Sequence, residues 1–271
     1  MSRNFELLQN LGKDFLQPTP VENPAPPAPG PVPVESVAPA SPVITAIPAA
    51  IPAAATVAPV VMDQAGLEEV GGLVQQLFVA QGANVPRTIV FASTEPGSGC
   101  TWVCANVAKV LATSTAGSVC VVDANLRDPG LHTQFGVQNT GGLSESLRQL
   151  SPIRSFVMQL SPPNLFLIAG GTSEDGEPAQ IASDRMRLRV AELRQEFDFV
   201  LIDASAMSLG NDAIALSAMA DGAVLVLKAN TSRRELARKA VQDLQAGNAK
   251  VLGAVLNRRT FPIPNAIYKR L

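Results

Sequence analysis

The sequence predicts an α/β fold built on a mainly parallel sheet with helices on both faces. Short apolar runs alternate along the chain with segments of helical periodicity, and the runs are continuously apolar. Strands covered on both faces have this composition, and strands joined through helices form parallel sheets with right-handed crossovers. The expected strands are 88–92, 119–122, 165–169, 199–202, 223–227 and 251–256, and the expected helices between them are 101–113, 184–196, 211–219 and 232–246.

The composition indicates an ordinary globular domain with tails. The chain has 271 residues, a net charge of −2, three cysteines and a single histidine, His132. This charge gives no reason to expect a nucleic-acid partner, and one histidine is too few for a His/Cys zinc site. No apolar run is long enough for a transmembrane segment, and the N-terminus has no signal-peptide pattern. We therefore expect a cytoplasmic protein.

The first 62 residues differ from the rest of the chain. Residues 1–16 have apolar side chains at roughly helical spacing, which predicts a short amphipathic helix that either frays or docks on a partner or on its own core. Residues 17–62 hold 13 of the 22 prolines and two charges, which predicts a Pro/Ala-rich disordered linker. We expect the folded domain over 63–260, followed by a short tail, 261–271.

Two helices flank this domain in the sequence. A helix over 67–81 would place Leu67, Val70, Val74 and Leu77 on one face. The helix over 232–246 is expected to begin with a capping box from Ser232 to Glu235 and to end near Gly247.

The stretch from Thr88 to Thr101 has the plan of a phosphate-binding loop. A buried strand leads into a loop with Gly97 and Gly99, and an amphipathic helix follows. Glycines let the backbone approach a phosphate, and the helix N-terminus adds partial positive charge. A P-loop has lysine after the last glycine and then Ser or Thr. Here Cys100 takes the lysine position and Thr101 provides the hydroxyl.

Two further strands end in an aspartate, Asp123 and Asp203. In a parallel sheet these carboxylates emerge at the same edge as the glycine loop. Magnesium bound to phosphates needs a hydroxyl and one or two carboxylates. Thr101, Asp123 and Asp203 are therefore the predicted metal site.

The ordered motifs resemble those of the bacterial tyrosine kinase (BY-kinase) family, P-loop proteins related to the MinD/ParA group. They run from the glycine loop through VVDANLRDPGLH, GGLSESL, FDFVLID and DAIALSAMADGAVLVL to VLGAVLNR. The resemblance implies that Asp123 and Asp203 are the catalytic Walker A′ and Walker B aspartates and that ATP or ADP binds with Mg²⁺. It implies a nucleotide site made of Gly97, Ser98, Gly99, Cys100, Thr101 and Trp102, with Asn257 near the adenine and Arg258 beside it.

The same resemblance implies a function in exopolysaccharide or capsule biosynthesis and export. The expected partner is a membrane polysaccharide co-polymerase, through which the chain would lie peripheral to the inner membrane; a homo-oligomeric state stays open.

The sequence departs from the family pattern at the positions expected to bind and transfer phosphate. Cys100 replaces the lysine, bulky Trp102 replaces a small residue, and Asn125 replaces a second aspartate. The arginine-rich assembly helix and the C-terminal tyrosine cluster are missing, which leaves Tyr268 as the one candidate phospho-acceptor. Lys109 lies about 13 Å along the helix from the loop and is expected to point away from it.

These departures predict a degenerate kinase that regulates its membrane partner by protein contact. Loss of one charge-assisted contact weakens nucleotide binding by about 10- to 150-fold. One alternative is an active ATPase or autokinase with Tyr268 as acceptor. A second is a redox-responsive protein in which the helix N-terminus lowers the pKa of Cys100 and Cys104 resolves the oxidised thiol. A third, a MinD/ParA-like positioning ATPase, is disfavoured by the missing lysine and the short, proline-broken tail.

Overall fold

A computed structural model describes residues 64–79, 85–172 and 181–258, which all fall within one compact unit. The predicted helix 1–16, linker 17–62 and tail 261–271 lie outside the described residues, as does Tyr268. The description below therefore concerns the domain alone.

The described residues form a seven-stranded sheet in the order β3-β4-β2-β5-β1-β6-β7. Every neighbouring pair is parallel except β3 with β4. All six predicted strands are confirmed; the added strand, β3, is too short to show a sequence pattern. The bounds are β1 Thr88–Ser93, β2 Val119–Asp123, β3 Met158–Gln159, β4 Leu165–Ile168, β5 Phe199–Asp203, β6 Gly222–Lys228 and β7 Val251–Asn257.

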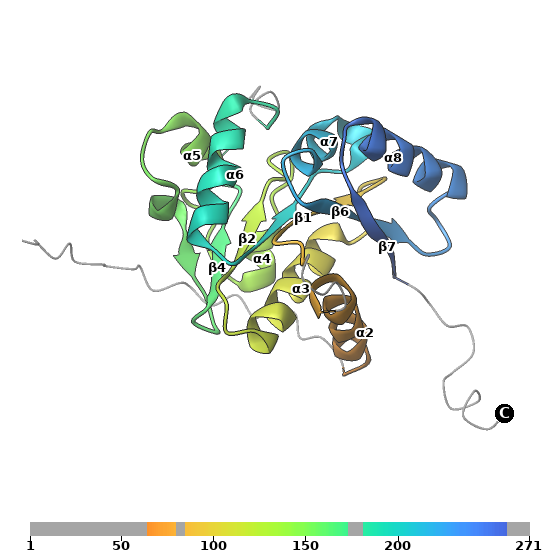
Figure 1. The fold of residues 1–271 in the computed structure, drawn as a ribbon, viewed down its shortest axis with the longest axis horizontal. Helices are drawn as coiled ribbons and strands as arrows, with labels where there is room; N and C mark the ends of the chain where they lie inside the picture. The colour runs from red at the N-terminus through yellow and green to blue at the C-terminus, as the bar shows by residue number, and fades with distance from the viewer. Residues whose placement is uncertain (1–63, 80–84, 173–180, 259–271) are drawn as a thin grey trace, which may run out of the picture. The chain divides into compact units, whose positions relative to one another are not determined.

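Helices cover both faces of this sheet (Figure 1). The predicted helices are confirmed, and the helix predicted over 67–81 continues from α2 into a π-helical turn, η1, up to the last described residue, 79. The short helices α4 and α5 and the 3-10 turns η3 and η5 had no periodicity long enough to predict them. The bounds are α2 Gln64–Val74, η1 Gln75–Val79, α3 Cys100–Ser114, α4 Leu131–Phe135, α5 Leu143–Arg148, η3 Ile153–Phe156, α6 Asp184–Glu196, η5 Met207–Leu209, α7 Asp212–Ser217 and α8 Arg234–Ala246.

Alternate residues of each strand supply two separate cores. In β1, Ile89 and Phe91 belong to the cluster that includes side chains of α2 and α3, whereas Val90 and Ala92 belong to the cluster that includes side chains of α5, α6 and α7. All four are fully buried. This two-sided burial explains why the strands are continuously apolar, and it anchors the loop that follows β1 on a rigid strand.

On the predicted helix face, Val70, Val74 and Leu77 are buried, whereas Leu67 is 51% exposed; periodicity identifies a helix face but not how far the opposing surface extends. One local expectation was wrong. The Ser232–Glu235 capping box does not form, because the Ser232 hydroxyl accepts from the backbone N–H of Lys228 (3.0 Å) and closes the turn after β6. Helix α8 begins without a side-chain cap and ends at Gly247 as expected.

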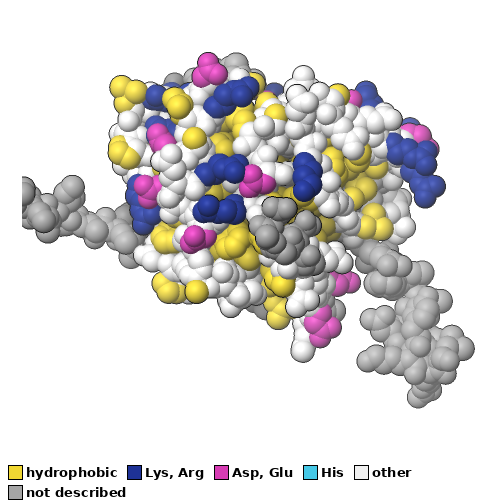
Figure 2. Space-filling model, viewed as in Figure 1, with side chains coloured by type: hydrophobic (Ala, Val, Ile, Leu, Met, Phe, Trp, Pro, Cys, Tyr) yellow, Lys and Arg dark blue, Asp and Glu magenta, His cyan; other side chains and the backbone are white. Residues whose placement is uncertain are grey.

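The surface carries mixed charge. In Figure 2, basic side chains lie over α6 and over α8, with acidic side chains close to them. On α6, Arg187 pairs with Asp184, and Arg194 pairs with Asp221. Across the ranges that the structure describes, every helix is too short or too polar to cross a bilayer.

Candidate nucleotide site

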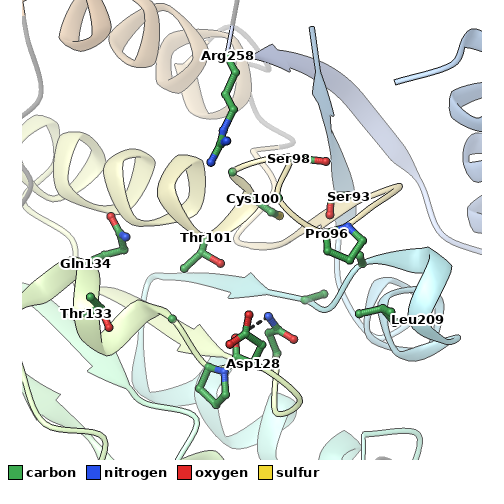
Figure 3. Close-up of a pocket in the computed structure, with 17 residues that line it drawn as sticks. Ser93, Pro96, Ser98, Cys100, Thr101, Asp128, Thr133, Gln134, Leu209 and Arg258 are labelled. Carbon is green, nitrogen blue, oxygen red and sulfur yellow. Dashed lines mark hydrogen bonds between the residues drawn. The ribbon is translucent and has the colours of Figure 1, made fainter. Parts of the chain in front are cut away.

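A pocket of about 430 Å³ opens at the carboxyl end of β1 (Figure 3). Its walls come from the loop between β1 and α3, the loop after β2, the start of α4 and the segment after β5. The lining residues are Ser93, Pro96, Gly97, Ser98, Gly99, Cys100, Thr101, Asn125, Asp128, Pro129, Gly130, Thr133, Gln134, Ala204, Ala206, Leu209 and Arg258. Ligands of open parallel sheets bind at this edge.

The loop itself is held in a tight conformation. Gly97 and Gly99 have φ angles of +75° and +82°, which L-residues with a side chain rarely adopt. The buried Ser98 hydroxyl donates to the carbonyl of Glu95 (2.7 Å). Helix α3 begins directly after Gly99, so the unpaired N–H groups of its first turn lie at the pocket. This is a backbone cradle for an anion.

The end of β7 ties the loop to the sheet. The Asn257 side chain donates from Nδ2 to the carbonyl of Ser98 (2.9 Å), and its Oδ1 accepts from the backbone N–H of Arg258 (2.8 Å). A Cβ on Gly99 would collide with the Asn257 amide. The Asn257 amide is thus used to hold the loop, whereas the family resemblance places this residue near the adenine.

The two strand-end aspartates lie side by side, as predicted, because Asp123 and Asp203 are register partners across β2 and β5. Both are fully buried. Asp123 accepts from the backbone N–H groups of Gly130 (2.9 Å), Leu131 (2.8 Å) and Asn125 (3.3 Å). Burial nevertheless raises the pKa of Asp123 to about 6, against the opposing effect of these donors.

Asp203 has less support. Neither of its carboxylate oxygens has a partner at full hydrogen-bond geometry, and the nearby Thr101 and Cys100 side chains stabilise the charge only in part. Burial, and then the charge of Asp123, raise the pKa of Asp203 to about 8. Buried carboxylate oxygens without partners are rare in native structures, and a bound cation would satisfy them.

A hard cation fits this arrangement. The Thr101 side chain lines the pocket, and its hydroxyl lies close enough to Asp203 to lower the pKa of that carboxyl in part. Asp123 and Asp203 do not line the pocket themselves: they are fully buried beside lining residues, Asp123 bonded to Gly130 and Asp203 directly before Ala204. These three side chains offer oxygen donors, the ligand type that Mg²⁺ prefers, next to the pocket. When bound, Mg²⁺ would supply positive charge there, and Thr101, Asp123 and Asp203 would hold it, with Asp203 giving up its proton.

Cys100 occupies the lysine position without replacing its charge. The thiol is buried, and burial, followed by the nearby Asp203 charge, raises the pKa of Cys100 well above its usual value. The redox alternative, which requires a lowered pKa at Cys100, is therefore wrong, because desolvation by burial has the largest effect on this thiol. Cys104 is also buried, and burial raises its pKa too. Neither thiol has the exposed, acidic character of a redox sensor.

The other predicted residues are divided between the pocket and its surroundings. Asn125 lines the pocket, and its Nδ2 donates to the carbonyl of Asp128 (2.8 Å). Trp102 points instead to an adjoining hollow of about 330 Å³, together with Gly99, Gln134, Asn257 and Arg258. It packs against the core and is not among the residues lining the phosphate pocket.

Lys109 does not serve the pocket, as predicted. Its Nζ donates to the carbonyl of Gln134 (3.1 Å) and lies 4.9 Å from the ring centroid of Phe135. Sequence reasoning missed Thr133, Gln134 and Leu209 as lining residues. The two from α4 belong to a five-residue helix, and Leu209 belongs to a three-residue 3-10 turn, so periodicity offered no signal for them.

The sheet, the glycine loop and the paired carboxylates define a P-loop NTPase-like protein. No family model matches the chain. It is 30% identical over 171 residues to the tyrosine-protein kinase YwqD of Bacillus subtilis, covering 63% of this chain and 72% of that protein. The chain therefore belongs to the bacterial tyrosine kinase family, which confirms the resemblance.

Three other comparisons agree. The chain is 30% identical over 175 residues to the succinoglycan biosynthesis transport protein ExoP of Rhizobium meliloti, covering 64% of this chain and 22% of that longer protein. The crystal structure of the chimerical protein CapA2B2 is 26% identical with a TM-score of 0.66, over 72% of this chain and 85% of that one. A ParA family ATPase from Chlorobium tepidum shares the fold, with a TM-score of 0.52, 21% identity and coverage of 64% and 74%.

The two loop glycines are expected to differ in their response to alanine. Gly97→Ala should cost about 1 kcal/mol of unfolding free energy, because it strains the backbone and its Cβ meets nothing within 4 Å. Gly99→Ala should cost more, because its Cβ would also displace the Asn257 amide from Ser98. Urea unfolding of both variants measures this difference, and equal losses would contradict it.

Asp203 should make the nucleotide-free protein less stable as the pH rises. Folded Asp203 keeps its proton up to about pH 8, whereas an unfolded aspartate loses it near pH 4. The folded state therefore binds more protons than the unfolded state between about pH 4 and pH 8. The unfolding free energy decreases as the pH rises through this range. Asp203→Asn removes the free-energy cost of ionising this buried carboxyl. The variant should therefore be roughly 1–3 kcal/mol more stable than wild type at pH 8.

Urea unfolding at pH 6 and pH 8 tests this expectation. Asp184→Asn is the matched control, because the Asp184 side chain is fully exposed and its replacement should leave the pH dependence unchanged. The account of Asp203 is wrong if wild type gains stability from pH 6 to pH 8, or if Asp203→Asn is the less stable protein at pH 8.

Proposed function

We propose that this chain is a nucleotide-binding but catalytically weakened member of its kinase family. In this role it regulates a membrane polysaccharide co-polymerase by protein contact during exopolysaccharide or capsule assembly. The observation that carries the proposal is the buried, uncharged Cys100 at the lysine position of an otherwise complete cradle. The family supplies the polysaccharide context: ExoP, a relative, is named as a succinoglycan biosynthesis transport protein.

The cradle supports binding of ATP or ADP with Mg²⁺. The loop and the first turn of α3 offer backbone N–H groups for phosphate, and Thr101, Asp123 and Asp203 would hold the metal. The metal would supply positive charge that offsets the negative charge of the phosphates. Compared with an intact P-loop, we expect weaker nucleotide binding, because one charge-assisted contact is absent.

Phosphoryl transfer should suffer more than binding. The P-loop lysine stabilises charge that develops on the transferred phosphoryl group, and loss of one such donor typically costs 10²–10³ in rate. Asn125 adds to this loss, because an amide cannot act as the general base that the family's second aspartate could provide. The Asn125 side chain is also held by Asp128.

An active autokinase is the second candidate function. The observation that favours it is that Thr101 lines the pocket and lies close to Asp203, which is paired with Asp123 across β2 and β5. Tyr268 would be the acceptor. In this alternative the remaining cradle would support enough turnover to modify a single tyrosine.

The proposal predicts that full-length wild type, co-expressed with a membrane co-polymerase, carries no phosphotyrosine. It also predicts ATP hydrolysis about 100-fold slower than in the Cys100→Lys variant. Phosphotyrosine immunoblotting and a phosphate-release assay measure these quantities, with an active family member as positive control.

Phosphotyrosine on wild type that disappears in Tyr268→Phe would establish the autokinase instead. Hydrolysis equal in wild type and Cys100→Lys would show that the missing lysine is not what limits this site.

A further inference from the structure

We propose that Arg258 supplies the positive charge that the loop lacks at Cys100 and binds the phosphate groups of the nucleotide. This inference rests on the proposed nucleotide-binding function. It concerns a residue that the family resemblance places beside the base.

Arg258 reaches the loop at the required point. Among the described residues that line the pocket, it is the one lysine or arginine. A Cβ built on Gly99, the residue before Cys100, would lie 3.6 Å from Arg258 Nε. Figure 3 shows the side chain extending from the end of β7 toward the start of α3.

The same contacts that hold the loop also direct Arg258. The Asn257 side chain bonds the Ser98 carbonyl through Nδ2 and the Arg258 N–H through Oδ1. Arg258 has a φ of +56°, which is uncommon for a residue with a side chain. The loop and the arginine are therefore positioned together by one amide.

The guanidinium is available for a ligand. Within the described ranges, Arg258 forms no ion pair. Two other cations are already engaged: Arg127 lies 3.6 Å from Asp212, and Lys109 donates to the carbonyl of Gln134. Asp128, the acidic residue in the same pocket lining, lies on the opposite wall in Figure 3. An exposed guanidinium facing backbone N–H groups suits a phosphate, which it can bind through two parallel hydrogen bonds.

An arginine entering from β7 does not restore the lysine. The lysine position itself is filled by the buried Cys100 thiol, so the charge approaches the phosphates from a different side. This geometry would support binding while leaving the transferred group without its usual partner. It gives a physical reason why the site would retain nucleotide binding while losing phosphoryl transfer.

The test compares Arg258→Gln with Arg234→Gln in the full-length chain. Arg234 is an exposed residue of α8, so its replacement controls for the loss of one surface charge. A fluorescent ATP analogue is bound in the presence of Mg²⁺ and displaced with inorganic tripolyphosphate, which carries phosphates but no base. Circular dichroism confirms that each variant is folded.

We expect Arg258→Gln to weaken tripolyphosphate displacement by about 10- to 150-fold and Arg234→Gln to leave it unchanged. In a Cys100→Lys background the loss at Arg258 should be smaller, because the restored lysine shares the same phosphates.

Unchanged tripolyphosphate affinity in Arg258→Gln overturns the inference and leaves the proposed function intact. The same conclusion holds if only the ATP analogue binds more weakly, because Arg258 then contacts the base and not the phosphates. If wild type binds neither the analogue nor tripolyphosphate, nucleotide binding itself fails and the inference fails with it.

Discussion

The pairing of β2 with β5 places two aspartates, Asp123 and Asp203, side by side in a fully buried position. Two adjacent carboxylates without water are unfavourable unless something compensates them. Asp123 is compensated by backbone N–H groups of the loop that follows β2, and this bonding shapes one wall of the pocket. Asp203 has no hydrogen-bond partner at full geometry within the described residues and keeps its proton up to about pH 8. A buried carboxyl that ionises so reluctantly beside the pocket is the reason to expect that a bound cation would replace its proton.

The site separates two tasks that a P-loop usually combines. Its backbone conformation, set by Gly97 and Gly99 and fastened by Asn257, is that of a phosphate cradle. The positive charge that accompanies such a cradle is absent from its usual place, where the buried thiol of Cys100 lies. In the function proposed above, binding depends on the cradle, the metal ligands and the nearby Arg258. Transfer would depend on charge held at the reacting phosphate, which the buried thiol of Cys100 does not supply.

Much of this organisation could be predicted from the sequence. Continuously apolar strands predicted the parallel sheet. They also predicted that Asp123 and Asp203 meet at one edge, because parallel strands all end at the same edge of a sheet. The buried faces of long helices were also predictable, because several turns are needed before a periodic pattern can be recognised. Short elements were not: α4, which contributes Gln134 to the pocket, has five residues and no measurable period.

Where an expectation or an alternative fails, the cause is that a local pattern does not report the tertiary environment. The redox alternative requires the helix N-terminus to make the Cys100 thiol acidic, but burial beside Asp203 raises its pKa instead. Ser232 has the spacing of a helix cap, yet its hydroxyl bonds to Lys228. Arg258 could be named from the sequence as a site residue, but only the folded chain shows that it reaches Gly99.

The most direct test of this account is the number of protons released when Mg·ADP binds. Calorimetric titration of the full-length chain at pH 7, in two buffers of different ionisation enthalpy, measures this number. Because Asp203 has a pKa of about 8, metal binding at its carboxylate should displace about one proton. Saturable binding with that release would support a metal-assisted nucleotide site. Absence of binding, or binding with the same heat in both buffers, would contradict it.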